Sequence, residues 1–108
     1  MIDAMAVDAQ WLYRIVPTRP EMTVSPTDEE AALASAHFEY LLALEERGIL
    51  ILAGRTQEDV GTFGIVIFEA PDREAAQAVT DADPAVAGGL FAATLHPYRV
   101  AVARDGLG

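Results

Sequence analysis

His37 is the side chain in this sequence best suited to proton transfer. An imidazole titrates near neutral pH, so it can take or give a proton under ordinary conditions. His37 falls on the apolar stripe of an expected helix, between Leu33 and Leu44 at helical spacing, so we expect it to point inward. Two interpretations are open at this point. His37 is a general acid or base in a pocket, or it is a structural histidine bonded to a buried polar partner.

Tyr40 and Arg14 are the candidates for holding a substrate. Tyr40 lies three residues after His37, so the two side chains share a helix face, although core packing is the alternative role for Tyr40. Arg14 stands in a strand segment between two apolar residues. A buried guanidinium needs an anion, which is either an internal carboxylate or a ligand. Weaker candidates of the same kind are Arg19 and Arg99.

Other chemistry finds little support in the residue spacing. Asp83 stands directly before Pro84, which is typical of an aspartate that caps a helical turn. His96 precedes Pro97 in the last strand segment, and we expect it to be structural or exposed. No short ligand motif joins His37 and His96, so neither a metal nor a cofactor is predicted. The sequence contains neither a phosphate-loop pattern nor a serine nucleophile-elbow pattern.

The helix that carries His37 is marked at both ends. Thr27 with Glu30 three residues later forms a capping box, which predicts that the helix starts there. The helix should run to about Arg47, because Gly48 is a typical residue just beyond a helix end. A second helix is expected from Arg73 to about Thr80, followed by a break at the Asp-Pro pair.

Four apolar segments predict strands, and with the two helices they give the order β-α-β-β-α-β. This order is the split βαβ plan of ferredoxin-like domains, so the fold class is α+β. We expect residues 1–9 to form a flexible N-terminal arm, residues 10–103 a single domain and residues 104–108 a C-terminal tail. The strands are expected at residues 11–16, 49–53, 63–68 and about 90–102, the last interrupted near Pro97.

The composition excludes several partners. The 108-residue chain has a formal net charge of −10, and such a surface repels phosphate backbones, so neither nucleic acid nor a membrane is an expected partner. No apolar run approaches the ~20 residues needed to cross a membrane, and the first ten residues lack a secretory pattern. We therefore expect a cytoplasmic protein. The chain has no cysteine, which rules out thiol nucleophiles and disulfides within it.

The strand segments predict a homodimer. A sheet with one face in water alternates apolar and polar residues, but residues 49–53 and 63–68 are apolar at nearly every position. Two helices can cover only one face of a four-stranded sheet. A second copy that packs sheet face against sheet face would bury the other one and give a dimeric α+β barrel. The alternative is a monomer whose helices and arms wrap both faces.

Several segments, in their order and spacing, resemble proteins of the YCII-related family. The resemblance runs from about Trp11 to Val102. The segments that carry it are Ala36-His37-Phe38-Glu39-Tyr40-Leu41, Leu52-Ala53-Gly54, Ile67-Phe68-Glu69-Ala70, Glu74-Ala75-Ala76, Asp81-Ala82-Asp83-Pro84 and His96-Pro97-Tyr98-Arg99-Val100.

The resemblance implies a ferredoxin-like dimeric α+β barrel with a His/Asp pair in a pocket. The matching positions here are His37 and Asp83. A carboxylate on one ring nitrogen would fix the tautomer of the histidine and stabilise its charged form. Most members of the family have no assigned reaction, and some are tied to the turnover of chlorinated aromatic diols and triols.

The leading hypothesis for function is therefore a small-molecule enzyme of the isomerase, lyase (dehalogenase) or hydrolase type. It would use the His37–Asp83 dyad for general acid–base chemistry on a small aromatic or lactone-like substrate. The alternative is a non-catalytic module that binds a small ligand, or an accessory subunit. A third hypothesis gives the acidic surface a basic protein partner.

Overall fold

The computed structural model of the chain describes residues 9–104 and has the predicted order of elements. The predicted fold class, α+β with a ferredoxin-like split β-α-β-β-α-β sheet, is confirmed. The elements are β1 (Ala9–Pro17), a 3-10 helix η1 (Pro20–Thr23), α1 (Asp28–Glu46), β2 (Leu50–Arg55), β3 (Gly64–Ala70), α2 (Arg73–Ala82), α3 (Pro84–Ala87) and β4 (Phe91–Tyr98).

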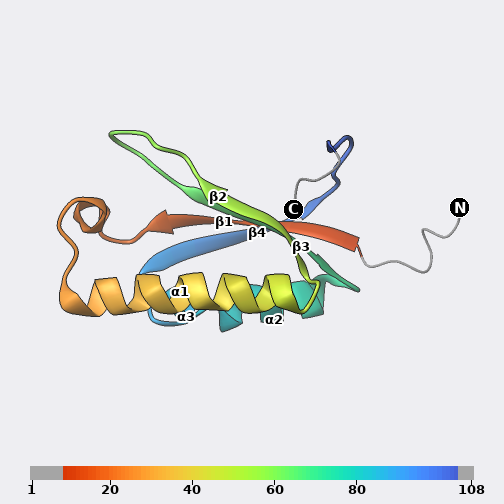
Figure 1. The fold of residues 1–108 in the computed structure, drawn as a ribbon, viewed down its shortest axis with the longest axis horizontal. Coiled ribbons are helices and arrows are strands. Elements are labelled where there is room, and N and C mark those ends of the chain that lie inside the picture. The colour runs from red at the N-terminus through yellow and green to blue at the C-terminus, as the bar shows by residue number, and fades with distance from the viewer. Residues whose placement is uncertain (1–8, 105–108) are drawn as a thin grey trace, which may run out of the picture.

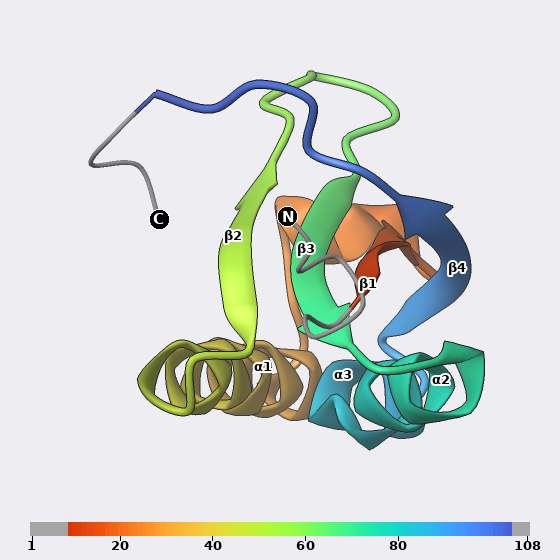
Figure 2. The same cartoon turned by 90° about the vertical axis from the view of Figure 1, so that its right-hand side faces the viewer.

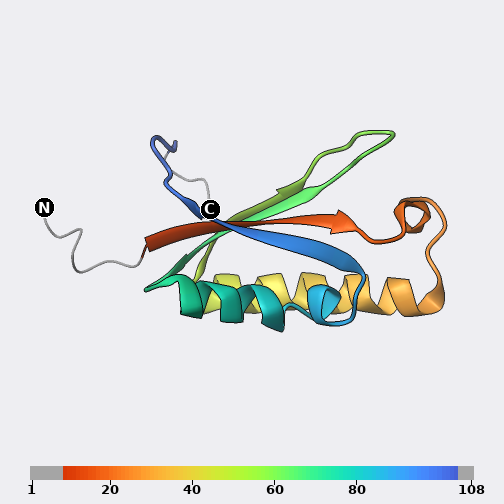
Figure 3. The ribbon, with the colours of Figure 1, turned by 180° about the vertical axis from the view of Figure 1, so that it is seen from behind.

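The molecule has two layers, a sheet and a row of helices (Figure 1). The sheet has four strands in the order β2-β3-β1-β4, and all neighbouring pairs are antiparallel. The helices α1, α2 and α3 all lie on the same side of this sheet (Figures 1 and 3). The helices pack against one face of the sheet, in which β3 and β1 are the central strands.

The core lies between the sheet and the helices. Along β1 the buried side chains are Trp11, Tyr13 and Ile15, while the residues between them face the other way. Val66 and Phe68 of β3 pair with Tyr13 and Trp11 and complete the core on the same side. The alternation of side chains along a strand thus decides which residues of β1 can reach the helices.

The start of α1 is built as its sequence predicts. The side-chain oxygen of Thr27 accepts a hydrogen bond from the Glu30 backbone N–H at 3.1 Å, and the Glu30 carboxylate accepts one from the Thr27 N–H at 2.9 Å. Beyond the other end, Gly48 has a φ of 75°, a conformation that favours glycine. Both ends of the helix that carries His37 are therefore specified locally.

Glu30 also pairs with Arg19, and this pair makes the start of α1 sensitive to acid. The Arg19 guanidinium donates to Glu30 at 2.8 and 2.7 Å. This hydrogen bonding, helped by the Thr27 backbone N–H, lowers the pKa of Glu30 to about 2 from its ordinary value of 4.5. The stabilisation by ionised Glu30 is complete above its unfolded-state pKa of 4.5 and is lost as the pH falls toward the folded-state value of about 2.

Replacing Arg19 with glutamine should therefore move the acid-unfolding midpoint of the protein to higher pH. The reason is that the folded-state pKa of Glu30 returns toward its unfolded value, and ionised Glu30 loses its preference for the folded chain. Circular dichroism followed from neutral pH downward measures the midpoint. Arg47→Gln, at the exposed far end of α1, is the control. Equal midpoints for Arg19→Gln and the unaltered protein would contradict the prediction.

The last strand and the ends of the domain differ from the prediction. β4 ends at Tyr98 instead of about Val102, and Pro97 lies within it, opposite Trp11. The strand tolerates Pro97, which has no N–H, because β4 is an edge strand with one side free of a neighbour. Strand β1 begins at Ala9, a residue predicted to belong to the arm. The rest of that arm, residues 1–8, and residues 105–108 of the predicted tail lie outside the described residues.

The second face of the sheet carries no helix among residues 9–104 (Figure 2). The segment that follows β4 runs on this side, opposite the helices (Figure 2). The expectation that the helices cover one face only is thus confirmed, while the pairing of two copies remains a prediction. None of the helices within residues 9–104 has the length and apolar character needed to span a membrane.

Candidate functional site

His37 and Asp83 are in direct contact. The distance from His37 Nδ1 to Asp83 Oδ2 is 2.7 Å, although the residues are 46 positions apart in sequence. The Asp83 side chain is completely buried, and that of His37 is 15% exposed. The structure therefore brings together the two residues that the family resemblance pairs.

Asp83 is positioned by the junction of two helices. It is at once the C-cap of α2 and the N-cap of α3, with extended backbone angles, because the residue before Pro84 is pushed out of the helical region. Its Oδ1 accepts a hydrogen bond from the Ala85 backbone N–H at 3.0 Å. The capping role leaves Oδ2 free to face α1.

A close approach of the end of α3 to α1 brings Asp83 within reach of His37. Gly88, the C-cap of α3, lies against Leu33, one turn before His37 on α1. A Cβ atom at Gly88 would stand 2.7 Å from Leu33 Cδ2 and 3.0 Å from the Pro84 carbonyl oxygen, which is too close for any larger residue without a shift. The glycine thus permits the helix spacing that the dyad requires.

Tyr13 is a third member of the cluster, which the sequence analysis did not single out. Tyr13 lies in the middle of β1 and is fully buried. Its hydroxyl donates a hydrogen bond to Asp83 Oδ2 at 2.8 Å. Burial first, and then the Asp83 carboxylate, raise the pKa of Tyr13, so the phenol stays protonated and acts as a donor. Its sequence signal was a hydroxyl on the buried face of a strand, which requires a partner.

The three donors together satisfy a buried carboxylate. Asp83 accepts hydrogen bonds from Tyr13, His37 and the Ala85 backbone, so its charge is compensated without contact with water. Because the carboxylate is the acceptor in each bond, Nδ1 carries the proton in the bond with His37. The remaining nitrogen, Nε2, has no hydrogen-bond partner among residues 9–104.

Tyr13→Phe should lower the free energy of unfolding by about 1.5–3 kcal/mol, the usual worth of a hydrogen bond to a charged group. The ring remains, with its edge-to-face contact to Phe68 at 5.8 Å between centroids, so only the hydroxyl is lost. Urea unfolding of the two proteins measures the difference. Tyr40→Phe, whose hydroxyl bonds a backbone carbonyl instead, is the matched control. A loss no larger than that of the control would contradict a special role for the Tyr13–Asp83 bond.

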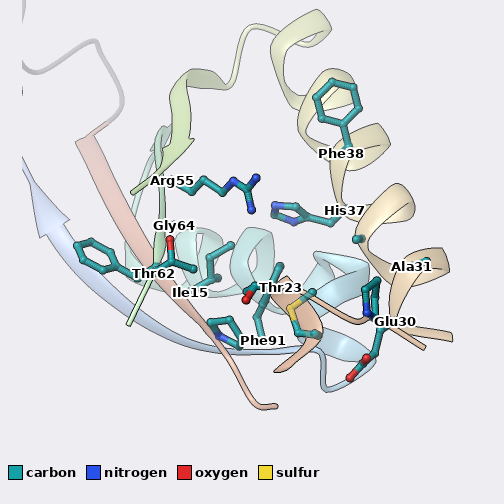
Figure 4. Close-up of a pocket in the computed structure, with 15 residues that line it drawn as sticks. Ile15, Thr23, Glu30, Ala31, His37, Phe38, Arg55, Thr62, Gly64 and Phe91 are labelled. Atoms are coloured by element: carbon teal, nitrogen blue, oxygen red, sulfur yellow. The ribbon is translucent and has the colours of Figure 1, made fainter. Parts of the chain in front are cut away.

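His37 lines a cavity of about 500 Å³ between the sheet and the first half of α1 (Figure 4). Apolar side chains form most of its wall, among them Ile15, Met22, Phe38 and Phe91. The Phe91 ring meets the imidazole edge to face, with 5.4 Å between ring centroids and 81° between their planes, and so holds its orientation. The size and the mostly apolar wall suit a small organic molecule.

Few polar groups line this cavity besides His37. Glu30 does so while bonded to Arg19 and the Thr27 N–H. Arg55, the last residue of β2, lines it from the opposite side and extends toward His37 (Figure 4). In the sequence, Arg55 lies just beyond the second expected strand, residues 49–53. Its register opposite Gly64, on the helix-facing side of the sheet, is what brings it to the cavity.

Tyr40 and Arg14, the predicted substrate-binding residues, do not line this cavity. The Tyr40 hydroxyl donates to the Val79 carbonyl oxygen at 2.7 Å and so ties α1 to α2, which is the packing role considered for it. Arg14 is exposed on the sheet face away from the helices. Among residues 9–104 no carboxylate forms an ion pair with Arg14, and its guanidinium lies over the Phe63 ring, 4.5 Å from the centroid.

Arg19 and Arg99, the weaker candidates for binding an anion, do not line the cavity either. Arg19 pairs with an internal carboxylate, that of Glu30, and Arg99 is exposed. His96 is exposed, with Nε2 3.0 Å from the Thr94 hydroxyl, as expected of a structural or surface residue. Within residues 9–104, no group of three histidine or carboxylate side chains lies close enough together to hold a metal ion.

Two solved structures resemble this chain to different degrees. The 5-chloro-2-hydroxyhydroquinone dehydrochlorinase of Burkholderia phenoliruptrix AC1100, solved with 2,5-dihydroxybenzoquinone, is similar at a TM-score of 0.65 and 19% identity, over 83% of this chain and 93% of that one. The ligand-free regulatory subunit of aspartate kinase from Thermus thermophilus has a TM-score of 0.45 and 20% identity, over 84% of this chain and 52% of that one. No curated protein matches the sequence.

Likeness at these identities shows the fold alone, and the family comes from the sequence. The model of the YCII-related domain matches residues 12–95, which is most of the chain. This span includes α1 with His37, the junction with Asp83, all of β2 and β3, and the greater part of β1 and β4. The chain therefore belongs to the YCII-related family.

Proposed function

We propose that this protein is a small-molecule enzyme in which His37 acts as the general acid or base and Asp83 orients it. One observation carries the proposal: Nδ1 of His37 is bonded to a buried carboxylate while the residue lines a cavity large enough for a small substrate. This is the arrangement by which a carboxylate fixes a histidine for proton transfer.

The chemistry follows from the two ring nitrogens. With its proton on Nδ1, the neutral imidazole presents a lone pair at Nε2, which takes a proton from a bound substrate. The imidazolium that forms is stabilised by Asp83, whose charge acts strongly because the carboxylate is out of contact with water. In the reverse direction Nε2–H returns the proton to a leaving group or to carbon.

The mostly apolar cavity suits an aromatic or lactone-like substrate. The dehydrochlorinase with the same fold is named for a chlorinated aromatic triol. Loss of HCl from such a compound balances in two steps. A hydroxyl proton is first moved to the ring carbon that bears chlorine, which gives a keto form. A second hydroxyl proton then passes to His37, the electron pair of that O–H bond forms a carbonyl, and chloride departs with the C–Cl pair, so a quinone forms and no external oxidant is needed. Isomerisation and lactone hydrolysis are the other reactions open to the same dyad.

A turnover assay tests this proposal. Purified protein is mixed with a panel of chlorinated hydroxyhydroquinones, other phenols and small lactones, and chloride release and ultraviolet spectra are followed. We expect turnover of at least one compound, with saturation kinetics. Compounds that bind the cavity, seen by NMR, without any turnover across the panel would contradict the enzyme proposal and favour a ligand-binding module.

We also propose that two copies pair through the open face of the sheet. Leu52, Ile67 and Leu12 form an apolar row across β2, β3 and β1 on this face, with Ile65 beside it. An apolar face of this kind favours a second apolar surface. Light scattering after size-exclusion chromatography should give a mass twice the 11.6 kDa of the chain. A mass equal to one chain at micromolar concentration would contradict this pairing.

A further inference from the structure

Among residues 9–104, Arg55 is the charged residue of the cavity wall that pairs with no carboxylate, and it is exposed to solvent. Its neighbours in the sheet place it on the helix-facing side, opposite Gly64, and its guanidinium extends across the cavity toward the His37 ring (Figure 4). The two residues approach the same space from opposite walls, one from the end of β2 and the other from the middle of α1.

Arg55 forms no ion pair with any of the described residues. Within residues 9–104 the arginine–carboxylate pair is Arg19–Glu30, and the carboxylate of Asp83 is bonded to His37. Glu30 is the carboxylate that lines the cavity, and both of its oxygens are already bonded to Arg19 or to the Thr27 N–H. The fixed charge that remains unmatched in the cavity is therefore positive.

This positive charge stands out because the protein as a whole is acidic. The chain carries 17 acidic and only 7 basic residues, yet a free arginine faces the cavity while the carboxylate there is neutralised. Arg55 is exposed as well as part of the cavity wall, so its guanidinium is open to a ligand that enters from solvent. An arginine that presents a planar fork of N–H donors to a mostly apolar cavity is suited to a carboxylate or another planar oxyanion.

The base of the β2–β3 connection holds the Arg55 backbone in place. The next residue, Thr56, donates its N–H to the Phe63 carbonyl oxygen at 2.8 Å, and its hydroxyl accepts from the Phe63 N–H at 3.0 Å. The Thr62 hydroxyl also donates to the Thr56 carbonyl oxygen. The guanidinium thus extends from a fixed strand end, which favours specific binding.

We propose that Arg55 binds an oxyanion of the substrate and so makes the site selective for small aromatic anions. The inference rests on the proposed function in its use of the same cavity, and it adds the charge of the substrate. The anionic oxygen would lie against the guanidinium of Arg55, the ring would lie along the apolar wall near Ile15 and Phe91, and the reacting atom would face His37 Nε2.

Binding of paired probes tests the inference without any need for turnover. Benzoate and its neutral isostere benzamide are titrated into the isotopically labelled full chain at low ionic strength, and dissociation constants are taken from NMR shifts of cavity residues. We expect benzoate to bind about 10- to 100-fold more tightly than benzamide, the range for hydrogen bonds to a charged group. In Arg55→Gln this preference should disappear, while Arg47→Gln, which alters an exposed arginine at the far end of α1, should keep it.

A second pair of probes identifies the kind of oxyanion. 4-Nitrophenolate, used above the pKa of the phenol, is compared with neutral 4-nitroanisole. A preference for the phenolate larger than that for benzoate assigns Arg55 to an ionised phenol, and the opposite order assigns it to a carboxylate. Arg55→Lys should keep part of either preference, since the charge remains but the planar fork is lost.

The outcomes separate this inference from the proposed reaction. A wild-type protein that binds both anions no better than their neutral partners would overturn the role of Arg55, even if it shows turnover. Unchanged anion binding in Arg55→Gln would overturn it as well. A preference that is lost in Arg55→Gln but kept in His37→Gln supports the role of Arg55, whether or not a reaction is found.

Discussion

Asp83→Ala should lower the free energy of unfolding by about 3–5 kcal/mol, since each buried donor left unsatisfied costs about 1–3 kcal/mol. The change leaves three buried or nearly buried donors without an acceptor, those of Tyr13, His37 and the Ala85 backbone. Unsatisfied buried donors cannot be solvated, so their desolvation costs add to the loss of the cap. Urea unfolding followed by circular dichroism gives the difference directly.

Asp72→Ala is the matched control for this change. Asp72 caps α2 by accepting from the Ala75 N–H at 2.8 Å, but it is exposed and bonds neither a histidine nor a tyrosine. Loss of such a cap costs about 1 kcal/mol. Asp83→Ala should therefore be several-fold more destabilising than Asp72→Ala. Equal losses from the two substitutions would mean that Asp83 acts as a cap alone.

Asp83→Asn separates charge from shape. An asparagine oxygen can accept from His37 and Tyr13 in place of Oδ2, but its NH₂ group then faces the Ala85 N–H, where Oδ1 now accepts. Two donors in contact repel each other, so the variant should fold with a stability between those of the original protein and Asp83→Ala. A stability equal to that of the original protein would show that the charge of Asp83 adds nothing to folding.

His37→Gln should reduce turnover of any substrate found by the assay by about 10²- to 10⁴-fold, the range for loss of a general acid or base. Glutamine can still donate a hydrogen bond toward Asp83, so the fold should persist, but an amide neither takes nor gives a proton near neutral pH. Rates under saturating substrate, with the variant's fold checked by its unfolding curve, measure the effect.

Tyr40→Phe is the control for the histidine. Tyr40 is on the same helix, but its hydroxyl bonds Val79 and it does not line the cavity, so turnover should change little. Loss of activity in both variants would indicate damage to α1 instead of a missing proton carrier. Activity retained in His37→Gln within about threefold, far less than the loss expected of a general base, would remove His37 from the reaction.

Local signals account for the parts of the fold that the sequence predicts correctly. The capping box of Thr27 and Glu30 and the left-handed Gly48 act within a few residues of chain, so both bounds of α1 could be read directly. The position of Asp83 before Pro84 equally predicted its cap. These features depend on the neighbouring backbone and not on distant contacts.

The parts that the sequence misses depend on register and on which face a side chain takes. Arg55 reaches the cavity because it pairs with Gly64, and this pairing lies beyond the strand expected at residues 49–53. Arg14 was expected on a buried face, but its strand turns Tyr13 and Ile15 toward the helices and Arg14 away. The position of Pro97 inside β4 likewise follows from β4 being an edge strand.

The triple use of Asp83 has a consequence for how such a site can change over many generations. The same carboxylate caps α3, bonds Tyr13 and bonds His37, so most substitutions there would be removed by selection for a folded chain alone. His37 is less constrained by folding, because it makes a single side-chain hydrogen bond and lies at the edge of the cavity. With His37 as the proposed acid or base, a descendant that lost the reaction would keep the aspartate and lose the histidine first. On this proposal, the residue that faces Asp83 marks chemistry among related chains better than Asp83 itself does.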